Sequence, residues 1–313
     1  MLLTVLALVG PLFGLILIGF IAHRRAWLPA GSSGALNAYV VHLGLPAVLF
    51  RVLAETDTRE LWQPGFLLAT GGSMAILFAV ILVVRRRQGF PLAEAGLDGM
   101  IASYPNTGFM GIPLCLAAFG PTGALAAAIA AAIPVTIVFA VTIMIIEFDI
   151  HRDHALPAAL AKTARQIISN PLVLWPVLGT FWHATGLALP TPVHTIVNLL
   201  ADSASPCALV NIGLFLAESS HTGGHGRIGL LVGIKLFIQP ALAALVTLVL
   251  VPTPPVWASA AIVLAALPTG VGPFMIATHY GRDNSIPARA IFASTVLSLV
   301  TLTLLLVLLG RGA

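Results

Sequence analysis

The sequence predicts an all-α membrane protein with ten transmembrane helices, and three observations support this fold class. Of the 313 residues, 58% are hydrophobic and only 8% are charged, and the mean hydropathy is +1.02. A soluble domain needs more surface charge than this composition supplies. The apolar runs are continuous and rich in Leu and Ala, whereas the strands of a membrane barrel alternate between apolar and polar residues. The chain is therefore expected to be helical and to cross the bilayer many times.

Ten apolar stretches are long enough to cross a bilayer, which takes about 20 residues each. The expected spans are 2–22, 34–53, 65–84, 92–119, 123–147, 168–187, 193–217, 228–250, 255–280 and 286–309. These spans leave too few residues for a separate soluble domain. The first span should be retained, because its basic residues follow the apolar run, which is the reverse of the order in a signal peptide.

The basic residues between the spans predict the orientation of the chain. Eleven lie on one side of the membrane: Arg24, Arg25, Arg85, Arg86, Arg87, Arg152, Lys162, Arg165, Arg227, Arg282 and Arg289. Three lie on the other side: Arg51, Arg59 and Arg311. By the positive-inside rule the rich side is cytoplasmic, so both termini are expected outside the plasma membrane (the inner membrane of the cell). The same clusters account for the net charge of +4 without a nucleic-acid partner.

Intramembrane prolines repeat at a fixed spacing in the two halves of the chain. Their positions are Pro11, Pro46 and Pro105 in the first half and Pro171, Pro206 and Pro268 in the second. The separations are 35 and 59 residues in the first set and 35 and 62 in the second. Residues 1–150 and 151–313 are therefore predicted to be two repeats of five spans. An odd number of spans inverts the second copy, and inverted repeats are typical of transporters.

The fourth and ninth spans each contain a proline followed by Thr and Gly near mid-membrane. The two breaks consist of Pro105, Asn106, Thr107 and Gly108 in the first and Pro268, Thr269 and Gly270 in the second. Proline removes a backbone donor and glycine tolerates non-helical backbone, so both helices should unwind and restart. Each restart exposes N–H groups at the positive end of a helix, and Asn106 adds an amide donor. We interpret the pair as an anion-binding site; the alternative is that both helices are merely kinked.

These segments resemble the auxin efflux carrier family, which includes plant auxin exporters and bacterial malonate or organic acid permeases. The likeness extends over nearly the whole chain. It is most specific in Pro105-Asn106-Thr107 with the following MGIPL at 110–114, in ALPTGVGPFMIATHY at 266–280 and in NAYVVHLGLP at 37–46.

The resemblance implies a scaffold part made of spans 1, 2, 6 and 7 and a transport part made of spans 3, 4, 5, 8, 9 and 10. It implies that the two parts move by an elevator or rocking mechanism, on a fold like that of sodium/proton antiporters or bile-acid symporters. It also implies a carboxylate substrate near Asn106 and the crossing prolines. Plant members carry an acidic and a basic residue in the third span, whereas residues 65–84 contain none.

Four ionisable residues at membrane depth are candidates for function, because burying such a group is costly. Asp98 and Lys235 share a depth, so we expect either an ion pair in the transport part or separate snorkelling to the cytoplasmic surface. Asp202 sits alone in the seventh span and either faces the cavity or caps a kink at Ser203 and Ser205. His42 is either a hydrogen-bonded packing residue or part of the cavity lining.

The sequence favours a carrier over an enzyme, since it contains no nucleophile motif, phosphate loop or metal-binding motif, and no cofactor or metal is expected. Three classes stay open: an organic-anion carrier, a proton- or sodium-coupled carrier, and a membrane receptor without transport. An antiporter should carry an acid beside the breaks, where Asn106, Thr107 and Thr269 stand instead. We expect export of a small carboxylate driven by the membrane potential; the sequence leaves a homodimer open.

Overall fold

The computed structural model describes residues 2–29, 31–55, 62–150, 171–218 and 225–310. The regular secondary structure of the described residues is all helical, with one isolated backbone bridge and no strand. The helices of the first half are α1 (Leu2–Arg24), α2 (Ser32–Tyr39), α3 (Leu45–Ala54), α4 (Pro64–Leu67), α5 (Ser73–Arg87), α6 (Leu92–Ser103), α7 (Ile112–Ile133) and α8 (Phe139–Ile150). Those of the second half are α10 (Pro171–Ala184), α11 (Thr191–Glu218), α12 (His225–Gly233), α13 (Gln239–Leu245), α14 (Pro255–Ala265), α15 (Gly272–His279) and α16 (Ser285–Leu309).

Short π-helical segments join several of these helices without a break. They are η1 (Val40–Gly44), η3 (Leu68–Gly72), η4 (Thr107–Gly111), η5 (Pro134–Val138), η6 (Ile234–Ile238) and η7 (Val246–Leu250). Single π-turns of this kind often occur at functional sites, because they change which side chains face a neighbour. Two of them, η4 and η6, lie next to the broken helices.

Seven helices in the described part of the chain are long and apolar enough to cross a membrane. They are Val5–Arg24, Ser32–Ala54, Pro64–Arg87, Thr107–Ile133, Thr191–Glu218, Gly226–Leu250 and Ser285–Leu309. Large apolar side chains such as Leu17, Val249 and Leu304 are exposed on their outer faces. Such a surface fits lipid and not water, so the chain is an integral, multi-pass membrane protein.

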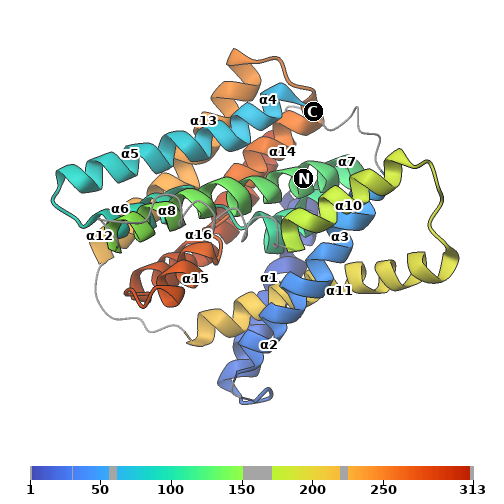
Figure 1. The fold of residues 1–313 in the computed structure, drawn as a ribbon, viewed down its shortest axis with the longest axis horizontal. Helices are drawn as coiled ribbons and strands as arrows, with labels where there is room; N and C mark the ends of the chain where they lie inside the picture. Colours follow the sequence, from blue (N-terminus) through green and yellow to red (C-terminus); the bar gives the residue numbers. More distant parts are fainter. Residues whose placement is uncertain (1, 30, 56–61, 151–170, 219–224, 311–313) are drawn as a thin grey trace.

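The helices gather into two groups. In Figure 1, α1, α2, α3, α10 and α11 lie together at the lower centre and right, while α5, α6, α8, α12, α15 and the labelled part of α16 lie on the left. In the first group α1 packs along α11, and α10 packs along α3. In the second group α5 packs along α6, and α12 packs against α16.

The predicted fourth and ninth spans are interrupted at their prolines. The fourth begins as α6, breaks at Tyr104 and restarts in η4 and α7. The ninth begins as α14 and restarts as α15. Within α7 the backbone turns sharply at Gly120, where φ is 68° and ψ is −155°. Glycine adopts this conformation without steric cost, and the turn separates the predicted fourth span from the fifth.

Helices cover each of the ten predicted segments over the described residues. Residues 151–170, which include most of the predicted connection between the halves and the start of the sixth span, lie outside the described residues. The count of ten membrane crossings and the inverted relation of the two halves stay predictions, and so does the division into a scaffold and a transport part.

Candidate functional site

The two broken helices cross each other at their non-helical segments. Pro105 and Thr269 face each other in an isolated antiparallel bridge. On one side of it the backbone N–H of Asn106 donates to the Pro268 carbonyl at 2.9 Å. On the other side the backbone N–H of Gly270 donates to the Tyr104 carbonyl, also at 2.9 Å. Breaking a helix leaves backbone groups without intrahelical partners, and here each break satisfies groups of the other.

Side chains from neighbouring segments support the crossing. The Thr269 hydroxyl donates to the Ile101 carbonyl at 3.0 Å, and the Thr269 N–H donates to the Ser294 hydroxyl of α16 at 3.1 Å. Gly272 permits the close approach of the two chains, because a Cβ there would lie 2.8 Å from atoms of both Met100 and Tyr104.

A cavity of about 120 Å³ lies beside the crossing. This volume holds several water molecules and therefore a small organic ion. The lining residues come from the broken helices and from α3, η1 and α8: Val41, Leu45, Leu49, Tyr104, Pro105, Asn106, Thr107, Gly108, Phe109, Ile112, Ala131, Phe139, Val271, Gly272 and Met275. None of these is charged. The cavity thus lies between the two helix groups and has mainly apolar walls.

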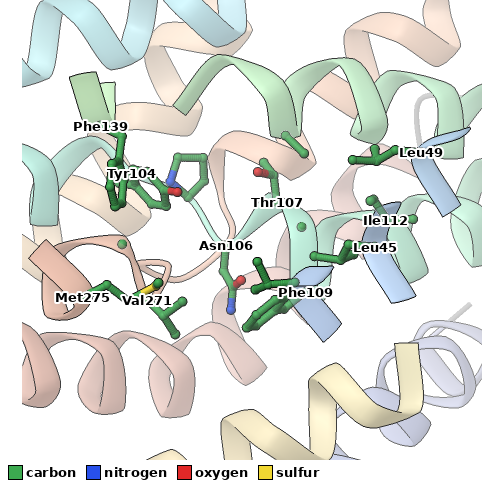
Figure 2. A pocket seen from close by; sticks show the side chains of 15 residues that line it. Leu45, Leu49, Tyr104, Asn106, Thr107, Phe109, Ile112, Phe139, Val271 and Met275 are labelled. Atoms are coloured by element: carbon green, nitrogen blue, oxygen red, sulfur yellow. The ribbon is translucent and has the colours of Figure 1, made fainter. Parts of the chain in front are cut away.

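Asn106 supplies the most prominent polar group in this cavity. Its side chain extends from the crossing between Phe109 and Val271, with the amide nitrogen pointing away from its own backbone (Figure 2). The residue is only 5% exposed, and the Nδ2 atom has no hydrogen-bond partner among the described residues. A buried donor without a partner is costly, so it points to a ligand that accepts a hydrogen bond.

The N-terminal ends of two helical segments also face the cavity. Gly108 and Phe109 belong to the first turn of η4, and Val271 and Gly272 begin α15. The first N–H groups of a helix have no intrahelical acceptor and carry a partial positive charge. Together with the Asn106 amide they can hold an anionic group without a basic side chain.

The structure distributes the predicted binding residues over two positions. Pro105, Asn106, Thr107 and Gly108 line the cavity. The second predicted segment, Pro268, Thr269 and Gly270, builds the crossing instead, and the cavity is lined by the residues that follow it. His42 lies outside the cavity; its side chain is exposed and Nδ1 is 3.0 Å from the Ala38 carbonyl oxygen. His42 is therefore left out of the candidate site.

The predicted ion pair between Asp98 and Lys235 is wrong. The Asp98 carboxylate is 1% exposed and accepts from Arg85 Nε at 2.7 Å. It also accepts from Arg227 Nη2 at 2.8 Å. Both guanidinium groups stack on Phe90, at 4.7 and 4.9 Å from the ring centre. These two arginines supply the hydrogen bonds and the counter-charge of the carboxylate, so it does not need Lys235 as a partner. They also hold Asp98 inside the protein, which excludes its independent snorkelling to the surface.

Lys235 is fully buried and has different partners. Its Nζ atom donates to the Ala265 carbonyl at 2.8 Å and to the Leu267 carbonyl at 2.6 Å. Both carbonyls belong to the end of α14 and the segment leading to the crossing. Snorkelling of this side chain to the cytoplasmic surface is therefore also wrong, because the helix end holds the ammonium group inside the protein.

Asp202 is not alone, contrary to the prediction. Its carboxylate accepts from Arg51 Nη1 at 2.9 Å, and its side chain is 71% exposed. It neither lines the cavity nor caps a kink at Ser203. The ion pair joins α3 to α11 within the first group of helices.

Several apolar residues of the site carry no individual signal in the sequence. Leu45, Phe109 and Met275 line the cavity as ordinary apolar residues of apolar helices. Gln239 donates to the Ser103 carbonyl at the end of α6, a contact across 136 residues. Such contacts follow from packing between distant segments. The resemblance at 37–46 and the cavity-lining alternative for His42 were the two indications that the second span contributes to the cavity.

Comparison with known proteins places this site in a transporter. A family model described as "Membrane transport protein" matches residues 4–306. A Rhizobium meliloti protein named "Putative malonate transporter" is 32% identical, with 98% of this chain and 96% of that protein covered. "Auxin efflux carrier component 8" of Arabidopsis thaliana is 21% identical, with 93% of each chain covered. An "Uncharacterized transporter" of Methanothermobacter thermautotrophicus is 25% identical, again with 93% of each chain covered.

The family model covers nearly the whole chain, and the three relatives, which are named as transporters or carriers, cover 93% to 98% of it. The chain therefore belongs to the membrane transport protein family that includes the auxin efflux carriers.

Proposed function

We propose that this protein exports a small organic monocarboxylate, which it binds at Asn106 and at the N-terminal ends of η4 and α15. The observation that carries the proposal is the buried Asn106 amide, whose Nδ2 atom has no partner in the described part of the chain. A carboxylate accepts hydrogen bonds from such a donor and is also attracted by the two helix ends.

The walls of the cavity favour one carboxylate and an apolar body. Leu45, Phe109, Phe139 and Met275 offer apolar surface, and the described lining residues include no Lys, Arg or His. A second carboxylate would be buried here without a counter-charge, which is costly. Although one relative is named for malonate, this cavity suits a monocarboxylate better than a dicarboxylate.

The proposed movement carries the crossing past the scaffold. The cavity is lined from one side by Val41, Leu45 and Leu49 of the second span, and from the other by the broken helices. A site at the boundary of two bodies becomes accessible from either side when one slides against the other, as in an elevator mechanism.

The membrane potential supplies the driving force. An interior-negative potential drives a monoanion outward by about 2.3 kcal/mol per 100 mV, which corresponds to roughly 45-fold accumulation. The described lining residues include no acid beside Asn106 that would hold a coupled proton or sodium ion. We therefore favour uniport, in which the anion crosses alone and no coupled ion has to be bound. Coupling to a proton or to sodium is the alternative.

Substitution of Asn106 tests the binding site. Asn106→Ala removes a donor to the carboxylate, so we expect binding to weaken by about 1.5 to 3 kcal/mol, or about tenfold to 150-fold in Kd. Titration of purified protein with a panel of mono- and dicarboxylates would measure this shift. Asn284→Ala, which removes an amide outside the cavity, is the matched control. An unchanged Kd in Asn106→Ala would place the anion elsewhere.

Flux in proteoliposomes tests the driving force. We expect uptake of the bound acid to follow an imposed potassium diffusion potential and to continue without a pH or sodium gradient. Transport that ignores the potential would contradict uniport and favour the coupled alternative.

A further inference from the structure

One continuous helical segment, α12 to α13, caps the C-terminal ends of α6 and α14, which are the first halves of the two broken helices. Gln239 donates through Nε2 to the Ser103 carbonyl at 3.0 Å and thereby caps α6. Lys235, four residues earlier, donates to the Ala265 and Leu267 carbonyls and caps α14. Both side chains project from the region of η6, and both are almost completely buried.

A neutral side chain is sufficient for such a cap, as Gln239 demonstrates at α6. Unlike that amide, the Lys235 amine can also carry a positive charge, which capping does not require. Among the described residues no carboxylate lies within ion-pair distance of Lys235. A charge at this position would be stabilised by the two carbonyls and by the negative end of the α14 dipole.

The Lys235 amine and the proposed binding residue, Asn106, are hydrogen-bonded to two adjacent residues of the same segment. Leu267 accepts from Lys235, and the next residue, Pro268, accepts from the Asn106 N–H. In transporters with broken helices, the C-terminal ends of half-helices and the unwound carbonyls are where coupled sodium ions bind. Here an ammonium group occupies carbonyls of that kind.

Other oxygen atoms lie near the same helix end. Thr70, Ser73, Thr107 and Gln239 lie around Ala265 in a closely packed region that has no room for a water molecule. Gln239 Oε1 is buried and has no hydrogen-bond partner in the described residues. Hydroxyl, amide and carbonyl oxygens are the ligands that a hard monovalent or divalent cation prefers.

We propose that Lys235 is a resident cation of the transport site: it occupies the position of a coupled alkali cation at the end of α14, and its charge supports anion binding at Asn106. The inference rests on the proposed function, and it explains why that function needs no sodium. Removing the ammonium group should convert the protein into one whose anion binding depends on an added cation.

Binding measurements on two variants separate charge from packing. Lys235→Met keeps most of the side-chain volume and removes the charge, so the anion Kd should rise about tenfold or more, whichever salt is present. A tenfold change corresponds to about 1.4 kcal/mol. Lys235→Ala removes a propylammonium unit, so its affinity should be low in choline chloride and recover when sodium or n-propylammonium replaces choline. Wild-type protein should bind equally well in all three salts.

Gln239→Ala is the matched control for the rescue. It removes the neutral cap from the same helix, so its anion affinity, whatever its value, should not respond to sodium or n-propylammonium. Thermal unfolding of each variant would show that it is folded. Should neither Lys235 variant fold, the salt dependence of the wild-type protein decides: independence of sodium supports the inference, and a requirement for sodium overturns it.

The outcomes distinguish this inference from the function on which it rests. Wild-type protein that binds no carboxylate would overturn both. Normal wild-type binding together with wild-type affinity in Lys235→Met would overturn the resident cation alone. A loss in Lys235→Ala that neither cation restores would also overturn it, because the loss would then reflect packing.

Discussion

Asp98 is the residue whose surroundings differ most from the sequence-based expectation. Its depth in the fourth span indicated a buried acid, and the acid is indeed buried, but its partners come from the ends of two other helices. Arg85 lies 13 residues away in sequence and Arg227 lies 129 residues away. In the sequence, both arginines serve only as evidence for the orientation of the chain in the membrane. The depth of a residue follows from its place in a span, whereas its partner depends on how the spans pack.

Neutralising Asp98 should destabilise the protein strongly. Asp98→Asn leaves Arg85 without its acid and, among the described residues, Arg227 paired with only Glu94, at 3.5 Å. Removal of one partner of a buried pair costs about 3 to 5 kcal/mol. Unfolding by SDS in mixed micelles would measure the change. Glu218→Gln, which removes an exposed acid 3.8 Å from His23, should change stability by less than about 1 kcal/mol. Equal effects of the two substitutions would contradict a structural role for the Asp98 cluster.

The broken helices illustrate what local sequence predicts at the scale of an element. Pro105 and Pro268 predicted two interruptions, because proline and the glycines after it are local signals. The second restart comes later than expected, at Gly272. The mutual hydrogen bonds of the two breaks join segments far apart in the sequence, and the Ser294 contact comes from α16, a third element. No local pattern indicates either.

Ser294 should be required for a stable crossing. Ser294→Ala leaves the buried Thr269 N–H without its acceptor, so we expect a loss of about 1 to 3 kcal/mol in the free energy of unfolding. Ser298→Ala is the matched control, since that buried hydroxyl donates only to the Thr295 carbonyl of its own helix. Its removal should cost clearly less. Both values come from the same SDS titration, and a ratio near one would argue against the crossing contact.

At the scale of the whole molecule, composition alone predicted a helical membrane protein, because the required apolar length is a property of the bilayer and not of the fold. The grouping of helices around the cavity was expected only through the family resemblance. Hydropathy says which segments cross the membrane, but not which segments touch.

The charge distribution predicts the orientation of the whole chain. With eleven basic residues on one side and three on the other, both termini should face away from the cytoplasm. Cysteine tags placed at either end should react with a membrane-impermeant maleimide in intact cells. A tag on the connection before Arg227 should react only after the cells are opened. Labelling with the opposite pattern would reverse the proposed orientation.

The bridge between Pro105 and Thr269 is made by main-chain atoms, and this has a consequence for how the family diversifies. Substituting a side chain does not delete a backbone N–H or carbonyl, so the framework of the crossing persists as the sequence drifts. The cavity walls, by contrast, consist of side chains such as Val41, Leu49 and Met275. Exchanging these reshapes the space without disturbing the crossing. One inherited framework can thus serve carriers for different acids.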